Sequence, residues 1–390
     1  MSRLKLAYIF DQNLPANTAE SEQLINTISA LSSRDYEVTL MIPAHNEKPN
    51  TCFEEIREFY HIHGNFRIEQ LHSIYPGSRL LQKAIHPILC ATLLRRKLAS
   101  HDLVYSRNIP AILAALSLGV PAMYDTYRPW PVQYHGAMNP LLKYIFAHSK
   151  FIGAALHSKY ACDAYGAIGA CQGKTLTAYN GYNPAYFEPV LTKEQARAQL
   201  GLDLHRPVAT YSGRMDPEKG LDSLADIAEK TPFCDFIFIG SRGDGPIEKR
   251  ICHLENVTIK PWLPFDQLAP YFYASDVLML PLTTQMIQKN SNTVLPIKIF
   301  SYFAAGRAIF APRAADTDEI LIHNDNAWLV QPNSPEAALK SFHSLIQSPE
   351  LMARLSISAR CYAESLTWSH RAAVLDGFIR RRLTEMQYRQ

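Results

Sequence analysis

Short apolar runs alternate with segments of helical period along most of this chain. Six runs rich in β-branched and aromatic residues predict strands in the first half, at Leu6–Phe10, Val38–Ile42, Leu103–Tyr105, Ala122–Tyr124, Phe151–Leu156 and Leu176–Tyr179. Beyond a polar stretch that ends near His205, the same rhythm predicts six more, at Val208–Tyr211, Phe236–Ile239, Val257–Ile259, Val277–Leu280, Ala308–Ala311 and Trp328–Val330. Strands that alternate with helices in this way are typical of parallel βα units.

Two such series predict an α/β protein with two Rossmann-like, doubly wound parallel-sheet domains that face each other across a cleft. The polar stretch between the series places the first domain at residues 1–185 and the second at residues 186–369. The chain from Ser334 onward has helical period with breaks near Pro349 and Thr367. We expect the last helix, residues 370–390, to pack back on the first domain.

The composition is that of an ordinary globular protein: 390 residues, 47% hydrophobic and 19% charged. A net charge of +3 is too small for the basic face that nucleic acid requires, so no nucleic-acid partner is predicted. The seven cysteines are scattered and never spaced CxxC, which favours a reducing cytoplasm. The first residues lack the apolar core of a signal peptide, and no apolar stretch reaches the roughly 18 residues that indicate a membrane span.

Ligands of open parallel sheets bind beyond the carboxyl ends of the strands, and the loop after Val208–Tyr211 is the most informative of these. It reads SGRMDPEKG and places Arg214, Lys219 and two glycines at a strand-to-helix turn. Arginine and lysine bind phosphate oxygens, and glycine allows a close approach of the backbone, so the loop predicts an anion site. The alternative is a solvated loop whose cations pair with Asp216 and Glu218.

A second candidate follows the Val277–Leu280 strand. There residues 290–298 read NSNTVLPIK and precede a helix that runs to Ala305. Pro296 suits the first helical turn, and free amides ahead of it would bind phosphate at the positive end of the helix dipole. An ordinary capped core helix is the alternative. No Asp or Glu occurs from Val277 to Ala315, whereas four cations do, and this imbalance favours an anion: Lys289, Lys298, Arg307 and Arg313.

Taken in order, these segments resemble the retaining GT-B glycosyltransferases of glycosyltransferase family 4, glycosyl transferases group 1. The resemblance spans nearly the whole chain. It is carried by YNGYN at 179–183 with Phe187 and Pro189, YSGR at 211–214 with EKG at 218–220, and IFIG at 237–240. Further on it includes Pro296, Lys298, Tyr302 and AAG at 304–306, and Thr367-Trp368 with Arg371-Ala372.

The resemblance implies a donor site in the second domain. Arg214 and Lys219 would hold the donor diphosphate and stabilise charge on the departing nucleotide. The remaining donor-binding positions that it implies are Gly213, Gly240, Asn292, Thr293, Val294, Lys298 and Ser301. Two of these positions depart from the family, which usually carries glutamates where this chain has Thr293 and Ser301. A hydrogen bond to a charged group contributes about 1.5–3 kcal/mol, so losing one is expected to weaken donor binding roughly 10- to 150-fold.

In the first domain, YDTY at 124–127 is similar to the family's YE.H turn that faces the donor sugar. Asp125 replaces the glutamate and Tyr127 the histidine, and both are candidate catalytic residues. The alternative is that Asp125 caps the following turn and Tyr127 packs against its neighbours. The loop at residues 11–17, where the family binds acceptor, lacks the usual paired glycines.

Residues 77–100 combine leucine and isoleucine with five cations: Arg79, Lys83, Arg95, Arg96 and Lys97. A basic amphipathic helix of this kind can lie on anionic lipid, which predicts a peripheral position on the inner face of the membrane. The alternative is an ordinary helix whose charged face is solvated. Asp316-Thr317-Asp318 has a DxD form, but it follows a strand and opens a helix, so helix capping is predicted and no metal site.

These observations and the resemblance predict a metal-independent hexosyltransferase without a cofactor. It would move a hexose-type sugar from a UDP- or GDP-sugar to a hydroxyl of a saccharide or lipid-linked saccharide, with retention, in polysaccharide or glycolipid biosynthesis. Because of Thr293 and Ser301, the alternative from another class is a catalytically silent GT-B protein that binds a partner enzyme or a saccharide. An enzyme with a small soluble acceptor and no membrane contact is a further alternative.

Overall fold

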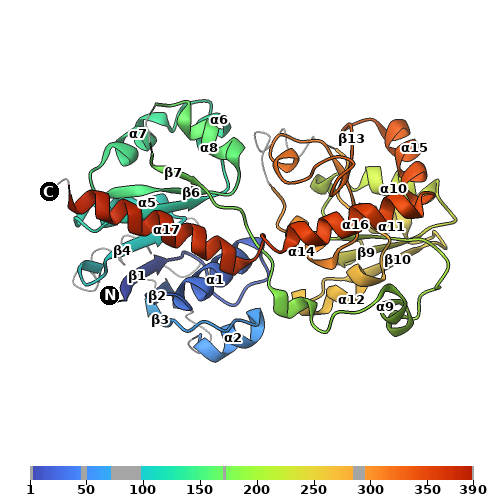
Figure 1. Ribbon diagram of the computed structural model, residues 1–390, viewed down its shortest axis with the longest axis horizontal. Coiled ribbons are helices and arrows are strands. Elements are labelled where there is room, and N and C mark those ends of the chain that lie inside the picture. Colours follow the sequence, from blue (N-terminus) through green and yellow to red (C-terminus); the bar gives the residue numbers. More distant parts are fainter. Residues whose placement is uncertain (1–2, 45–50, 72–97, 170–172, 284–294, 389–390) are drawn as a thin grey trace. The chain divides into compact units, whose positions relative to one another are not determined.

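The computed structural model describes residues 3–44, 51–71, 98–169, 173–283 and 295–388, which form two compact units (Figure 1). Unit 1 comprises Met1–Gly181 and Trp368–Gln390, and unit 2 comprises Tyr182–Thr367. The chain thus leaves unit 1 once and returns to it with its last helix.

Unit 1 is built on a seven-stranded parallel sheet with the strand order β3-β2-β1-β4-β5-β6-β7. Its strands are β1 (Leu4–Ile9), β2 (Tyr36–Pro43), β3 (Arg67–Leu71), β4 (Leu103–Ser106), β5 (Ala122–Thr126), β6 (Phe151–Leu156) and β7 (Thr175–Thr177). The order reverses between β1 and β4, which makes the carboxyl ends of these two strands the point where ligands bind in doubly wound sheets.

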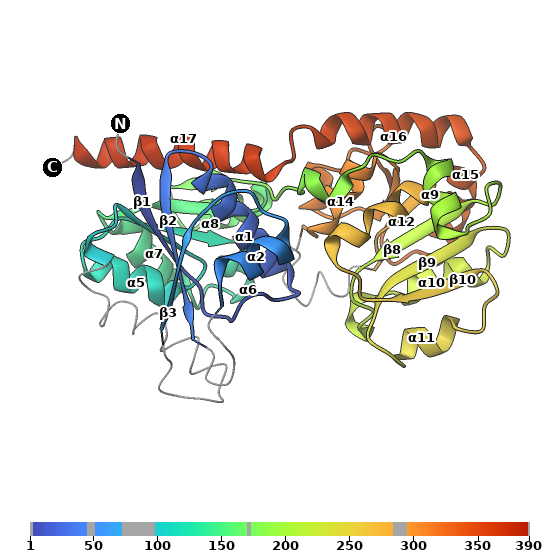
Figure 2. The ribbon, with the colours of Figure 1, turned by 90° about the horizontal axis from the view of Figure 1, so that it is seen from below.

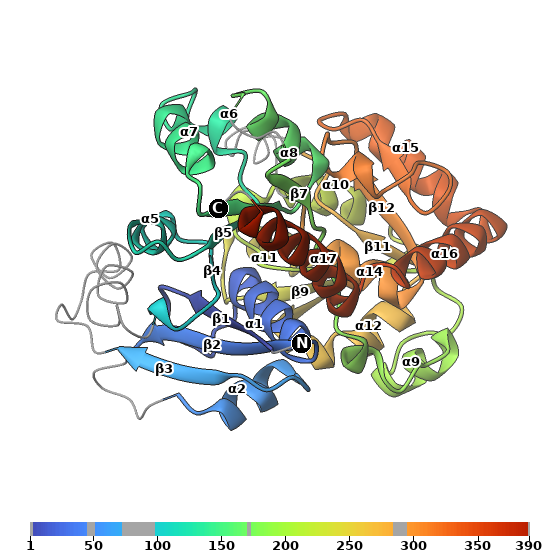
Figure 3. The ribbon, with the colours of Figure 1, turned by 60° about the vertical axis from the view of Figure 1, so that its left-hand side comes forward.

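Helices cover both faces of this sheet because alternate side chains of its strands point to opposite sides. Leu6 and Tyr8 of β1 pack with α1 (Ala19–Ser32), α2 (Phe53–Tyr60) and α17 (Trp368–Gln387). Ala7 and Ile9 pack with α5 (Ile109–Ser117), α7 (Asn139–Ala147) and α8 (Lys159–Gly166) on the other face. The last helix, α17, lies against α1 and β6 (Figure 3).

Unit 2 repeats this plan with a six-stranded parallel sheet of order β10-β9-β8-β11-β12-β13. The strands are β8 (Val208–Ser212), β9 (Asp235–Ser241), β10 (Val257–Pro261), β11 (Val277–Met279), β12 (Ala308–Pro312) and β13 (Trp328–Val330). Its helices are α9 (Lys193–Leu200), α10 (Asp222–Glu229), α11 (Pro246–Ile251), α12 (Ala269–Ala274), α14 (Lys298–Ala305), α15 (Pro335–Ile346) and α16 (Pro349–Ala363). Figure 2 shows α10 and α11 on one side of this sheet and α12, α14 and α16 on the other.

The two doubly wound parallel sheets confirm the predicted fold class. Each of the twelve predicted strands corresponds to a strand, with ends that shift by at most two residues. Strand β3 was not predicted, because its sequence RIEQL carries two charges and no apolar run. Such composition is common in edge strands, where charge prevents pairing with other chains.

Candidate functional site

The loop after β8 meets the end of β9 through two glycines. The Gly213 amide donates to the Ile239 carbonyl at 2.8 Å, and Gly213 and Gly240 have φ angles of 142° and 120°. A Cβ atom on Gly240 would lie 2.3 Å from the Gly213 carbonyl oxygen. Only glycine therefore allows the two strand ends to approach this closely.

Three cations gather at this turn: Arg214 and Lys219 from the loop and Lys298 from the start of α14. The Lys298 Nζ atom lies 4.1 Å from the centroid of the Tyr211 ring, and a Cβ atom on Gly213 would be only 2.3 Å from it. Burial, followed by the charges of Lys219 and Arg214, lowers the pKa of Lys298 to about 7. Burial and then Arg214 also lower the pKa of Lys219.

Acidic side chains only partly neutralise this cluster. Arg214 pairs with Asp216 at 3.2 Å, but the pair is solvent-exposed and weakly held, so the guanidinium can exchange partners. Within the described ranges neither Lys219 nor Lys298 forms an ion pair. The alternative of a self-neutralised loop therefore holds for Arg214 and not for Lys219. An unneutralised cluster beyond the carboxyl end of β8 is suited to bind an anion.

Among its described residues, the acid-free segment from Val277 to Ala315 contributes Lys298 to this cluster. Arg307 donates to the Tyr273 carbonyl at 2.6 and 3.0 Å, and Arg313 pairs with Asp318 at 3.1 Å. Both are thus used within the fold, whereas Lys298 is directed at the loop of Gly213. Lys289 lies outside the described residues.

Helix α14 is fixed to the sheet next to the cations. The Tyr302 hydroxyl accepts from the Ser212 amide at 3.0 Å and donates to the Met279 carbonyl at 3.3 Å. Ser301, at the position of a family glutamate, is partly buried and lies one turn after Lys298. The helix begins at Lys298, so Pro296 precedes it instead of occupying its first turn as predicted. Asn292, Thr293 and Val294 lie outside the described residues.

In unit 1, Asp125 at the end of β5 is buried in a network of polar side chains. Its carboxylate accepts from Gln23 at 2.9 Å, pairs with Arg371 at 3.2 Å and lies 2.9 Å from His157 Nε2. Burial favours a raised pKa of Asp125, but Arg371 and then His157 hold that pKa well below its usual range. Burial lowers the pKa of His157 to about 4, so at pH 7 the ring is neutral and donates to the carboxylate. Asp125 thus does not cap a turn, contrary to one of the two alternatives.

Tyr127 lies between two arginines. The guanidinium carbons of Arg107 and Arg128 are 5.3 and 5.2 Å from its ring centroid, and Arg128 Nε donates to its hydroxyl at 3.0 Å. Tyr127 therefore packs, as one alternative held, and it also carries a polar hydroxyl that is held by Arg128.

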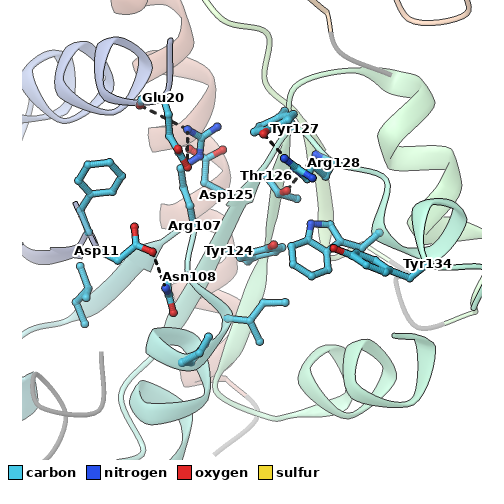
Figure 4. Close-up of a pocket in the computed structure, with 15 residues that line it drawn as sticks. Asp11, Glu20, Arg107, Asn108, Tyr124, Asp125, Thr126, Tyr127, Arg128 and Tyr134 are labelled. Carbon is cyan, nitrogen blue, oxygen red and sulfur yellow. Dashed lines mark hydrogen bonds and ion pairs between the residues drawn. The ribbon is translucent and has the colours of Figure 1, made fainter. Parts of the chain in front are cut away.

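These residues line a pocket of about 320 Å³ beyond the carboxyl ends of β1, β4 and β5 (Figure 4). Phe10 and Asp11 come from the end of β1, and Arg107 and Asn108 from the end of β4. The turn after β5 contributes Tyr127, Arg128, Trp130 and Tyr134. The pocket thus lies at the reversal point of the first sheet and has the size of a small-molecule site.

Four of the residues that define these sites were not predicted: Arg107, Arg128, His157 and the role of Arg371. Arg107 directly follows β4 and Arg128 follows β5, so the rule that ligands bind after strand ends would have found both. No local signal connects Arg371 to Asp125, which lies 246 positions earlier in the sequence.

The DxD segment forms the short η4 helix, Thr317–Glu319. Asp316 precedes it without a side-chain capping bond, contrary to the prediction, whereas Asp318 accepts from the Ala314 amide at 3.1 Å and pairs with Arg313. Across the part of the chain that is described, no three His, Cys, Asp or Glu residues gather as metal ligands.

The membrane prediction rested on residues 77–100, of which residues 77–97 lie outside the described ranges. In the rest of the structure, no helix combines the length and the apolar character that crossing a bilayer requires.

Comparison with known proteins agrees with this arrangement. Residues 206–348, which hold the cation cluster, match the family model described as glycosyl transferases group 1. The D-inositol 3-phosphate glycosyltransferase of Streptomyces scabiei is 24% identical over 217 residues, which cover 51% of this chain and 47% of that protein. The chain thus spans about half the length of the curated relatives it matches.

Two solved structures resemble the chain over nearly its full length. Sucrose-phosphate synthase from Thermosynechococcus elongatus superposes with a TM-score of 0.75 at 18% identity, covering 97% of this chain and 99% of that one. Anabaena Alr3699/HepE in complex with UDP and glucose gives 0.68 at 16% identity, covering 96% and 99%. The solved structures thus show that the chain has the GT-B fold, and residues 206–348 are similar to the glycosyl transferases group 1, as the sequence motifs suggested.

Proposed function

We propose that this protein is a glycosyltransferase that binds a nucleoside diphosphate sugar in unit 2 and transfers the sugar to an acceptor held by unit 1. The observation that carries the proposal is the cluster of Arg214, Lys219 and Lys298 at the reversal point of the second sheet. The lysines lack acidic partners within the described ranges, and a diphosphate supplies the missing negative charge. UDP and UDP-glucose complexes of the similar Alr3699/HepE support a nucleotide ligand.

The proposed reaction breaks the bond between the anomeric carbon and the phosphate oxygen and forms a bond from that carbon to an acceptor hydroxyl oxygen. The hydroxyl proton passes to the leaving phosphate. Arg214, Lys219 and Lys298 offset the charge that grows on that phosphate, and one such contact typically contributes about 3 kcal/mol. This electrostatic role needs no metal ion, because the three cations supply the positive charge.

We further propose a hexose-type sugar, retention of the anomeric configuration, and a saccharide or lipid-linked saccharide acceptor, as in polysaccharide or glycolipid biosynthesis. The family resemblance supports retention. We place the protein in the cytoplasm, at times peripheral to an anionic membrane. The free state of the five cysteines in the described ranges supports a reducing compartment.

Other site residues have separate proposed roles. Gly213 and Gly240 permit the backbone to approach the phosphates, and Ser301 faces the ribose in place of a carboxylate. Tyr127 faces the sugar with its hydroxyl. Asp125 acts on the sugar side mainly by positioning, since Gln23, His157 and Arg371 already bind its carboxylate.

The proposal is tested by titration calorimetry of the full chain with UDP, GDP and ADP. We expect one of the three to bind, and the corresponding nucleotide sugar to be consumed when acceptors are screened. Binding without turnover of any acceptor would favour the catalytically silent alternative, which Thr293 and Ser301 motivate. No binding of any nucleotide at millimolar concentration would overturn the donor site.

The partly buried Lys298 makes donor affinity sensitive to pH. With a pKa of about 7 the free lysine is half protonated at neutral pH, and only the protonated form attracts the diphosphate. Binding should therefore take up about half a proton at pH 7, and affinity should fall as the pH rises above 7, approaching about tenfold per unit. Calorimetry of UDP-glucose or GDP-mannose in buffers of different ionisation enthalpy measures the uptake, since the donor phosphates do not titrate there.

Lys298→Met separates this effect from general loss of structure. The substitution removes an uncompensated cation, so we expect a free energy of unfolding higher by about 0.5–2 kcal/mol together with weaker donor binding and no proton uptake. Donor affinity equal to that of wild type would remove Lys298 from the site.

A further inference from the structure

The pocket of unit 1 contains three acidic side chains, and each has partners in the protein. Asp125 is bound by Gln23, His157 and Arg371. Glu20 accepts from Gln12 at 2.9 Å and lies 3.8 Å from Arg107. Asp11 accepts from Asn108 Nδ2 at 3.3 Å. The acids of the pocket are therefore engaged with neighbours other than Arg128.

Arg128 takes part in none of these interactions. Its Nε atom donates to the Tyr127 hydroxyl and its guanidinium stacks beside the Tyr127 ring, which fixes its direction. Among the described residues no carboxylate forms an ion pair with it. Its own segment cannot supply one, because no Asp or Glu occurs between residues 126 and 162. A fixed guanidinium without an acid at a pocket wall is suited to bind a carboxylate or phosphate with its two terminal nitrogens.

Tyr134 lies on the same side of the pocket as Arg128 (Figure 4), and Trp130 lies beside Tyr134. Trp130 and Tyr134 have centroids 5.2 Å apart at an angle of 40°, and Tyr134 is 42% exposed. Flat faces of this kind pack against the apolar face of a sugar ring, and their polar edges tolerate water. Asp11 and Asn108 lie on the opposite side of the pocket from Arg128 in Figure 4, where they can accept and donate hydrogen bonds to sugar hydroxyls.

We propose that this pocket binds a saccharide that carries an acidic substituent, with Arg128 on the carboxylate or phosphate and Trp130 and Tyr134 on the ring. The inference rests on the proposed function, in which unit 1 holds the acceptor, and it narrows that acceptor to an acidic sugar. Arg107, neutralised by Glu20 and close to Asp125, keeps the pocket wall in place and does not bind the acid.

The test is NMR or calorimetric titration of the full chain with glucose, glucuronic acid and glucose 6-phosphate at physiological ionic strength. We expect one acid to bind about 10- to 150-fold more tightly than glucose, and the two acids distinguish a carboxylate from a phosphate site. Arg128→Gln should abolish this preference, and Arg128→Lys should keep part of it. Lys143→Gln removes the same charge from the same segment, at an exposed residue outside the pocket lining, and should leave the preference unchanged.

Equal affinity for glucose and both acids, no binding of either acid at millimolar concentration, or a preference that survives Arg128→Gln would overturn the inference. The same preparations are titrated with UDP and GDP. Nucleotide binding without an acid preference refutes this inference and leaves the proposed donor site standing. An acid preference without nucleotide binding refutes the donor site and not the pocket. Urea denaturation followed by circular dichroism, with a transition like that of wild type, shows that unit 1 of Arg128→Gln is folded.

Discussion

Arg214→Ala and Lys219→Ala are each expected to lower kcat/KM for the nucleotide sugar about 100-fold or more. Each removes a cation that would offset charge on the leaving diphosphate, and losing one preorganised contact of this kind costs roughly 2.7–4 kcal/mol in the transition state. Lys219 should show the larger effect on ground-state binding, because it has no acidic partner within the described ranges, whereas Arg214 must first leave Asp216. Initial rates of donor consumption and calorimetric nucleotide affinity separate the two effects.

Lys230→Ala is the matched control for these variants. Lys230 is exposed at the carboxyl end of α10. That helix follows the loop of the cation cluster and runs back toward the amino ends of the strands. The Lys230→Ala variant should retain wild-type kcat/KM, because it removes one positive charge from the same unit at a site far from the loop of Arg214 and Lys219. If Arg214→Ala and Lys219→Ala consume donor as fast as this control, the donor site has been assigned to the wrong residues.

Arg371→Met should destabilise unit 1 by about 3–5 kcal/mol. The guanidinium is fully buried, pairs with Asp125 and donates to the carbonyls of Ala178 and Tyr179. Removing it leaves the Asp125 carboxylate buried without its main counter-charge, because His157 is neutral at pH 7. Urea denaturation followed by circular dichroism measures the change in the free energy of unfolding.

Two companion variants test the cause of this loss. Arg380→Met, on the same helix, breaks a partly exposed pair with Asp376 and should cost no more than about 1 kcal/mol. Arg371→Met combined with Asp125→Leu removes both buried charges and should recover much of the stability. A midpoint for Arg371→Met that equals that of Arg380→Met would mean that the buried pair contributes little.

The buried pair explains why the chain returns to unit 1. Helix α17 contributes Leu375, Phe378 and Ile379 to the core beside α1, and it brings Arg371 to Asp125. The carboxylate at the end of β5 would otherwise be buried opposite a neutral histidine. The last helix is therefore part of the structure that shapes the pocket wall, and its loss should change the pocket as well as the stability.

The sequence by itself determined the fold and brought together two of the three cations of the proposed donor site. Apolar runs of strand length separated by helical period leave few solutions other than parallel βα units, so all twelve predicted strands exist. Arg214 and Lys219 share one short loop with their glycines, and local spacing therefore sufficed to bring them together. Strand β3 was not predicted, because a strand at the edge of a sheet does not require an apolar run.

Only the tertiary structure decided which distant charges meet. Four cations occur near the acid-free segment of unit 2, but it is packing that uses Arg307 and Arg313 within the fold and directs Lys298 at Gly213. The same is true of Arg371 with Asp125, and of Arg128, which has no acidic partner among the residues that the structure describes. Periodicity records which face of an element is buried, whereas the pairing of charges depends on which loops the sheet order brings side by side.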